Sequence, residues 1–172
     1  MILATAAGCS SAEESSDPWA AQIRDAKASA ASDFERDVLN DDVISRAEYE
    51  EAMDRFVQCM NDSGLPTSKG VAGDFYNVST SYPNGADTSG AVESECGQGT
   101  NGLIEVLYVS MTQNPENRPY NEVLAECFQR TGITKDGATR SDLDAAFEED
   151  RLNEVVDVEA QGFTDCMSNP SH

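Results

Sequence analysis

Four cysteines divide most of this chain into segments of similar length. Cys59, Cys96, Cys127 and Cys166 are separated by 37, 31 and 39 residues, and none of them belongs to a CxxC pair. Zinc knuckles and thioredoxin-like sites use closely spaced cysteines, so the wide spacing favours structural disulfides. In the chain-entropy model, a bridge that closes a loop of this length stabilises a fold by about 4 kcal/mol. The chain is therefore predicted to fold around two disulfides.

An internal similarity favours one of the three ways in which four cysteines can pair. The segments Cys59–Leu65 and Cys127–Ile133 both read cysteine, apolar, two polar, Ser or Thr, glycine and an aliphatic residue. Each is expected to end a helix, with its glycine in the left-handed position after the last turn. We therefore favour a bridge from each segment to the next cysteine along the chain, Cys96 or Cys166, and leave the other two pairings open.

Apolar residues at helical spacing predict a mainly α fold with four to five short helices. The stripe is clearest after Ser45, which forms a capping box with Glu48. A second cap is expected at Ser141, and the end of the chain from residue 163 is expected to be irregular and held by Cys166. The predicted helices cover residues 18–39, 46–63, 102–113, 119–130 and 142–158.

Residues 65–101 differ from the helical segments, because Gly, Ser, Asn and Thr dominate them. This long segment is predicted to be irregular, with one small β-hairpin. The hairpin is expected to contain Phe75, Tyr76, Val78 and Tyr82, with a turn at Asn84-Gly85. The aromatic residues of this segment are expected either to form a recognition surface or to cover one end of the helical core.

The fifth cysteine lies near the N-terminus, behind a run of small residues. Ala6-Ala7-Gly8-Cys9 resembles a bacterial lipobox, in which the cysteine receives a lipid and becomes the mature N-terminus. The match is imperfect, since Ala6 replaces the usual Leu and the apolar stretch ahead of it is short and lacks Lys and Arg. A lipid on Cys9 also explains the odd cysteine count. The alternative is a cytosolic protein with a chance cysteine.

These features predict three parts of the chain. Residues 1–8 are expected to be a truncated signal peptide, and residues 9–17 the lipidated cysteine and a polar tether. Residues 18–172 are expected to form a single helical domain stabilised by disulfides.

The charge of the chain excludes several classes of partner. It has 11 basic and 32 acidic residues, which gives a formal net charge of −21. Binding to nucleic acid needs clustered Lys and Arg, and electrostatic docking on anionic lipid needs the same, so neither is expected. The single histidine is His172, the last residue. We therefore predict no catalytic residue and no cofactor.

The acidic segment between the first two predicted helices has the most site-like pattern. When it is aligned with a calcium-binding EF-hand loop, Asp37 takes position 1, Asp41 position 5 and Glu48 position 12. Leu39 cannot supply the oxygen needed at position 3, and Asp42 stands where glycine makes the sharp turn. The alternative is a plain junction between two helices with Glu48 as a capping residue. Asp37, Asp41 and Glu48 are kept as candidate ligands of a weak calcium site.

Several segments resemble a recurring pattern in uncharacterised actinobacterial lipoproteins with paired cysteine-containing helices. In those relatives the position of Asp42 is usually Gly. The resemblance covers most of residues 35–170 and implies a cell-envelope address, but it supplies no activity and no catalytic residues. The segments that carry it are Asp41–Ala52, Phe56, Cys59-Met60, Gly64, Asn114-Pro115-Glu116, Cys127–Gly132 and Cys166 with Asn169-Pro170.

Taken together, these observations predict a non-enzymatic lipoprotein on the extracellular face of the cell membrane, anchored through its N-terminal lipid. Its helical module is expected to bind another protein or an envelope component. Two alternatives remain. One is a calcium-responsive module at the acidic junction, and the other is a cell-wall hydrolase that uses two facing carboxylates.

Overall fold

The computed structural model describes residues 17–172, except residues 84, 86–89, 136 and 172. This part of the chain contains nine helices and one two-stranded antiparallel sheet, so the mainly helical class is confirmed and the predicted number of helices is too low. The elements in chain order are α1 Ala20–Ser29, α2 Asp33–Val38, α3 Arg46–Asp62, β1 Thr67–Ala72, β2 Phe75–Thr80, α4 Ala91–Gly97, α5 Gly102–Gln113, α6 Tyr120–Arg130, α7 Arg140–Glu148, α8 Leu152–Val155 and α9 Gln161–Ser168.

The helix predicted over residues 18–39 is two helices, because Ser32 begins a second one. The Ser32 hydroxyl accepts a hydrogen bond from the backbone N–H of Glu35 at 3.1 Å. The Glu35 carboxylate in turn accepts one from the backbone N–H of Ser32 at 3.3 Å, which completes a capping box. This serine–x–x–glutamate pattern is visible in the sequence, but the apolar residues on both sides of it keep helical spacing, so the segment reads as one helix.

The helix predicted over residues 142–158 is also two helices. Thr139, and not Ser141, is the cap of α7, and it forms a capping box with Asp142. Asp150 has a φ of 53°, and this left-handed residue ends the helical path before α8 begins. The end of the chain, expected to be irregular, forms α9.

The hairpin is present, but its turn lies earlier than predicted. β1 and β2 pair antiparallel, with Ala72 opposite Phe75, so Gly73-Asp74 is a two-residue loop. Gly73 has a φ of 61°, which suits a tight hairpin turn. Tyr82 follows the sheet, and Asn84 of the predicted turn lies outside the described residues.

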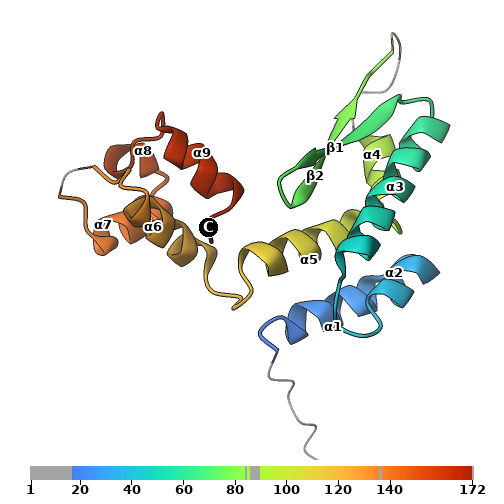
Figure 1. The fold of residues 1–172 in the computed structure, drawn as a ribbon, viewed down its shortest axis with the longest axis horizontal. Helices are drawn as coiled ribbons and strands as arrows, with labels where there is room; N and C mark the ends of the chain where they lie inside the picture. The colour runs from blue at the N-terminus through green and yellow to red at the C-terminus, as the bar shows by residue number, and fades with distance from the viewer. Residues whose placement is uncertain (1–16, 84, 86–89, 136, 172) are drawn as a thin grey trace, which may run out of the picture.

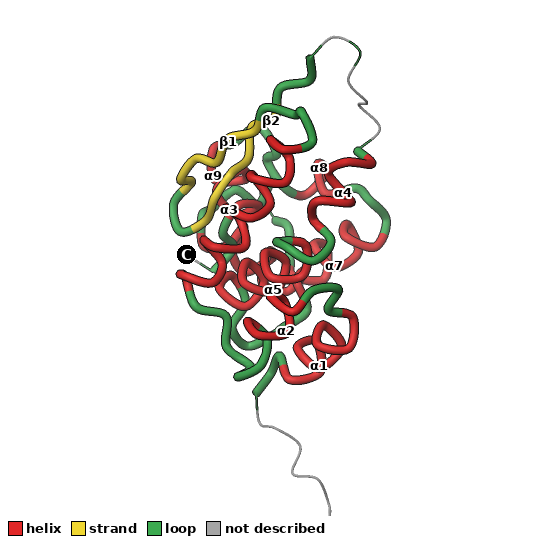
Figure 2. Tube along the Cα trace, turned by 90° about the vertical axis from the view of Figure 1, so that its right-hand side faces the viewer, coloured by secondary structure: helices red, strands yellow, loops and turns green. Residues whose placement is uncertain are grey.

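The helices form two groups, as Figure 1 shows: α1 to α5 with the hairpin on one side, and α6 to α9 on the other. Each group has its own hydrophobic core, centred on Tyr49 and Ile104 in the first and on Phe128 and Leu143 in the second. The first group also has a smaller cluster around Phe56 and Met60, beside its disulfide. Figure 2 shows the hairpin at the edge of the molecule beside α3. The single domain predicted for residues 18–172 stays a prediction, and its buried apolar residues form three clusters, two in the first group and one in the second.

Each group carries one disulfide. Cys59 of α3 is bonded to Cys96 of α4, and Cys127 of α6 is bonded to Cys166 of α9. These are the two pairs that the repeated sequence pattern favours.

The helix that precedes each bridge ends in the same way. Gly64 has a φ of 83° and Gly132 a φ of 69°, so both take the predicted left-handed position. The backbone N–H of the next residue, Leu65 or Ile133, closes the last helical turn at 3.0 or 3.1 Å. Leu65 and Ile133 are buried, so each helix end is fastened to the core beside its disulfide.

Candidate functional site

The three acids predicted as calcium ligands have separate roles in the structure. Glu48 caps α3, and its carboxylate accepts a hydrogen bond from the backbone N–H of Ser45 at 2.8 Å. Asp41 accepts one from the backbone N–H of Val43 at 3.2 Å, and Asp37 is an exposed residue of α2. Among the described residues, no group of three or more His, Cys, Asp or Glu side chains is arranged to hold a metal ion. The structure therefore does not bring Asp37, Asp41 and Glu48 together as a calcium site.

The backbone conformation of Asp42 explains why glycine is expected at this position. Its φ is 66°, in the left-handed region that glycine adopts without strain. Its carboxylate forms an ion pair with Lys27 of α1 at 2.7 Å. The junction between α2 and α3 is thus braced by a contact with α1.

The predicted aromatic group divides into two parts. Phe75 and Tyr76 of β2 pack against the first core, where the Tyr76 ring lies 5.4 Å from that of Tyr49. Tyr49 is fully buried and stacks on Tyr108 of α5, with 4.3 Å between the ring centroids. These residues cover the core, whereas Tyr82 is 42% exposed.

Polar contacts of the same side chains fix the hairpin on α3. The Tyr49 hydroxyl accepts a hydrogen bond from the backbone N–H of Tyr76 at 3.1 Å. Burial raises the pKa of Tyr49 above its ordinary value, so this hydroxyl stays protonated at neutral pH. The Tyr76 ring also lies under two cations, with Lys69 Nζ at 4.5 Å and the Arg46 guanidinium carbon at 4.8 Å from its centroid. These contacts therefore hold the hairpin in one position against α3.

Exposed apolar side chains gather on the hairpin segment. In the described part of the chain, seven large apolar residues are exposed, and three of them lie between residues 71 and 82. Val71 is 73% exposed and Val78 36% exposed. The other four come from other segments, namely Val43, Val106, Tyr120 and Met167. Two of these are neighbours, since the Tyr120 hydroxyl donates a hydrogen bond to the carbonyl oxygen of Met167 at 3.5 Å.

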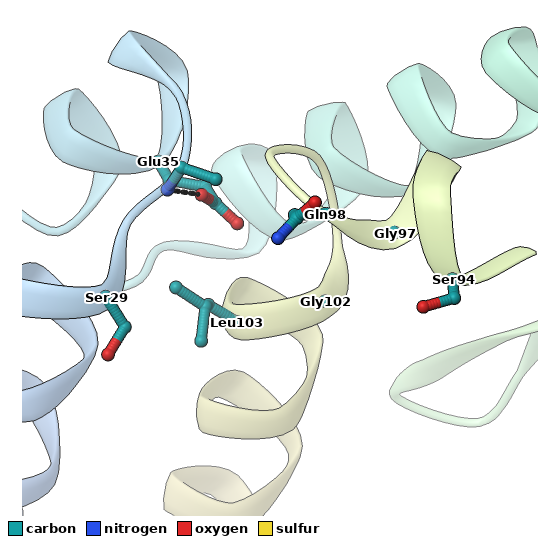
Figure 3. Close-up of a pocket in the computed structure, with 8 residues that line it drawn as sticks. Ser29, Glu35, Ser94, Gly97, Gln98, Gly102 and Leu103 are labelled. Carbon is teal, nitrogen blue, oxygen red and sulfur yellow. Dashed lines mark hydrogen bonds between the residues drawn. The ribbon is translucent and has the colours of Figure 1, made fainter.

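A pocket of about 380 Å³ lies between the α1–α2 turn and the α4–α5 turn, as shown in Figure 3. The carboxylate of Glu35 forms part of its wall and is only 1% exposed. One carboxylate oxygen, Oε2, accepts hydrogen bonds from the backbone N–H groups of Ala31 at 2.7 Å and Ser32 at 3.3 Å. In Figure 3 the other oxygen points into the space between Gln98 and Leu103.

The two walls of this pocket are tied together by Ser32. Its hydroxyl donates a hydrogen bond to the carbonyl oxygen of Gly99 at 2.7 Å, so the start of α2 is fastened to the loop before α5. Gly99 has a φ of 83°, and a Cβ there would lie 3.2 Å from the Cβ of Ser32. The polar groups of the pocket thus cap α2 and join it to the loop before α5. Neither the pocket nor the capping box that forms part of it is predicted from the sequence.

Glu35 and Glu48 make a matched pair for testing how much a capping carboxylate contributes to stability, since each completes a capping box. We expect Glu35→Ala to lower the free energy of unfolding by about 2 kcal/mol, because it removes the acceptor of two backbone N–H groups in a buried setting. Glu48→Ala is expected to cost about 1 kcal/mol, since its carboxylate is partly solvated. Urea denaturation measures both, and equal losses would show that burial of Glu35 adds nothing.

The two groups of helices meet at the loop between α5 and α6. The Trp19 indole N–H donates a hydrogen bond to the carbonyl oxygen of Asn114 at 3.0 Å, and the Asn117 amide donates one to the carbonyl oxygen of Pro18 at 2.7 Å. The Asn114 side chain closes the loop on the backbone of Arg118, at 3.0 and 2.7 Å. The segment before α1 is therefore held at this joint.

A second pocket of about 350 Å³ opens beside the joint, with Trp19 and Tyr120 in its lining. Arg118 also lines this pocket, and its guanidinium donates a hydrogen bond to Glu126 at 2.8 Å. That hydrogen bond holds the pKa of Glu126 below its ordinary value, so the pair is ionised at neutral pH. No local sequence pattern indicates this pocket, because its lining comes from the residue before α1, from the end of α5, from the α5–α6 loop and from the start of α6.

The candidate lipid site, Cys9, and most of the tether lie outside the described residues. Across the helices that the structure describes, none is long and apolar enough to cross a membrane. No family model, no curated protein and no solved structure matches this chain. A function for this chain therefore has to be inferred from its own sequence and geometry.

Proposed function

We propose that this chain is a non-enzymatic lipoprotein of the bacterial cell envelope, anchored through a lipid on Cys9, and that its folded part binds another protein. The observation that carries the binding role is the gathering of exposed apolar side chains on the hairpin segment. Clusters of exposed apolar residues on a soluble surface mark interaction sites, whereas single ones are ordinary.

The setting of these side chains supports the proposal. The chain has a formal net charge of −21, and one residue in four is charged, yet β2 carries no charged residue. The contacts of Tyr49 and Lys69 hold the hairpin in place on α3. A surface that is already ordered loses little conformational entropy when a partner binds.

The anchor is tested by lipid labelling of the precursor in a bacterium that processes lipoproteins, with a complete signal peptide supplied ahead of residue 1. Labelled fatty acid is expected to enter the wild-type chain and to be absent from Cys9→Ser. Ala6→Leu is the control in the opposite direction, since it brings the segment closer to a lipobox and should increase labelling. Label in Cys9→Ser would contradict the anchor.

The binding role is tested by a photo-crosslinking residue placed at Val78 or at Val43 in intact cells. Both positions are exposed valines, 36% and 60% respectively, but only Val78 lies on the hairpin. We expect a discrete crosslinked protein from position 78 and none from position 43. Absence of any product from position 78, or the same products from both, would overturn the proposal.

A further inference from the structure

The backbone groups of the hairpin alternate between pairing inward and pointing outward. In an antiparallel pair, every second residue pair exchanges hydrogen bonds, and the residues between them direct their N–H and C=O groups away. The Ser81 N–H donates to the carbonyl oxygen of Pro66 at 2.8 Å, which fixes the phase of this alternation. The outward positions are therefore Thr67, Lys69 and Val71 on β1, and Tyr76, Val78 and Thr80 on β2.

The outer edge of β1 is closed at its start by a side chain. The Asn61 amide donates a hydrogen bond to the carbonyl oxygen of Thr67 at 2.9 Å, and its oxygen accepts one from the Thr67 N–H at 3.0 Å. This amide occupies the place that a neighbouring strand would take. Lys69 then turns its side chain to Asp54 of α3 at 2.7 Å, so β1 runs along that helix.

The outer edge of β2 is open beyond its first outward residue. The Tyr76 N–H is taken by the Tyr49 hydroxyl. The outward N–H and C=O groups of Val78 and Thr80 have no hydrogen-bond partner among the residues that the structure describes. Natural edge strands are protected from pairing by charged residues, proline or bulges. The β2 segment Phe75–Thr80 contains no charged residue and no proline, so its edge lacks that protection.

We propose that the outer edge of β2 binds an extended, basic segment of a partner protein, which adds a third strand to the sheet through Val78 and Thr80. This inference rests on the proposed binding function and names its mode. Strand addition of this kind gains affinity from main-chain hydrogen bonds and specificity from alternate side chains. The exposed Val78 side chain offers an apolar contact for such an alternate residue.

The charge of the chain selects the occupant. Two copies that each carry a net charge of −21 repel one another, which opposes pairing of β2 with β2 of a second molecule. A segment that alternates apolar residues with Lys or Arg is instead attracted to the acidic chain, and its association weakens as salt rises.

The probe is a fluorescein-labelled peptide of alternating Val and Lys, with its binding to the folded chain measured by fluorescence anisotropy. Val78→Pro is expected to weaken binding about tenfold, since it removes an outward N–H and blocks close approach of a strand. The β1–β2 ladder does not use that N–H, so the hairpin is retained. Val71→Pro is the matched control, because it changes the same residue type at an outward position of β1, and its affinity should equal that of wild type.

A second measurement covers the case in which Val78→Pro does not fold. The same peptide with alternate backbone nitrogens methylated loses its donors on one edge, and it should bind wild type about tenfold more weakly. A peptide with Glu in place of Lys is expected not to bind. Equal affinity of the methylated and unmethylated peptides, or of the Lys and Glu peptides, would overturn the inference.

Two further outcomes separate this inference from the function on which it rests. A wild-type dimer in sedimentation velocity that Val78→Pro abolishes would assign the edge to a second copy and overturn the basic segment as occupant. A partner crosslinked at position 78 that still binds Val78→Pro would leave the proposed function standing and overturn strand addition. Absence of any crosslinked partner would instead overturn the proposed function.

Discussion

Replacing Cys127 and Cys166 together with alanine is expected to lower the free energy of unfolding of the α6–α9 group by about 4 kcal/mol. The bridge closes a loop of 39 residues, and both half-cystines are buried in the core around Phe128. A group of helices this small buries limited apolar surface, so a loss of that size takes most of its stability. Alanine is the suitable replacement, because serine would leave a buried hydroxyl without a partner.

Hydrogen exchange measured by mass spectrometry, segment by segment, checks this result. The α6–α9 segments should lose protection, while those of α3 and α5 should keep theirs, because the two groups have separate cores. The matched control is alanine at both Cys59 and Cys96. In that variant the segments of the first group should lose protection, while those of α6–α9 should keep theirs. Equal loss of protection across the whole chain from either pair would show that the two groups unfold as one unit.

Where structure depends on local signals, the sequence predicts it closely. The apolar stripe that follows the Ser45 cap predicts a helix over 46–63, and α3 spans Arg46–Asp62. The helix predicted over residues 102–113 coincides with α5. The repeated cysteine segments predict two left-handed glycines, and both are found at Gly64 and Gly132. Each of these features depends on residues within one or two helical turns.

Where structure depends on distant contacts, the sequence is insufficient. The first strand of the hairpin reads Thr-Ser-Lys-Gly-Val-Ala, which has little strand character. Its position is fixed by Asn61 and by the ion pair of Lys69 with Asp54, and both contacts come from α3. The predicted turn at Asn84-Gly85 is a good local signal, but the two strands of the hairpin are joined at Gly73-Asp74, and these strands pack on that helix.

The exposed surface of the hairpin also depends on distant contacts that the sequence does not show. Phe75, Tyr76 and Val78 form one apolar pattern in the sequence, and nothing in that pattern separates covered from exposed side chains. The structure separates them, because Tyr49 and Tyr108 cover Tyr76 and Phe75 while Val78 is left at the surface. The open edge of β2 also required knowledge of the register, which local sequence does not contain.

Substitution of Tyr49 is expected to give the second large effect, and it separates the aromatic stack from the hydrogen bond. Tyr49→Ala should lower the free energy of unfolding of the first group by about 3 to 5 kcal/mol, since it removes a fully buried ring that stacks on Tyr108. Tyr49→Phe keeps the ring and should cost about 1 kcal/mol, the contribution of one hydrogen bond to the Tyr76 N–H. Urea denaturation followed by the fluorescence of Trp19, the only tryptophan of the chain, reports on this core.

The same pair of variants tests whether Tyr49 holds β2 in place. In Tyr49→Phe the amide hydrogen of Tyr76 should exchange with solvent faster, because its acceptor is gone, while the amides of α3 keep their protection. Binding of the Val–Lys peptide should persist in this variant, since Val78 and Thr80 keep their outward groups. If Tyr49→Phe leaves the exchange of the Tyr76 amide unchanged, the hydroxyl does not fix the strand, and the order of the hairpin depends on the stacked rings and on Lys69 alone.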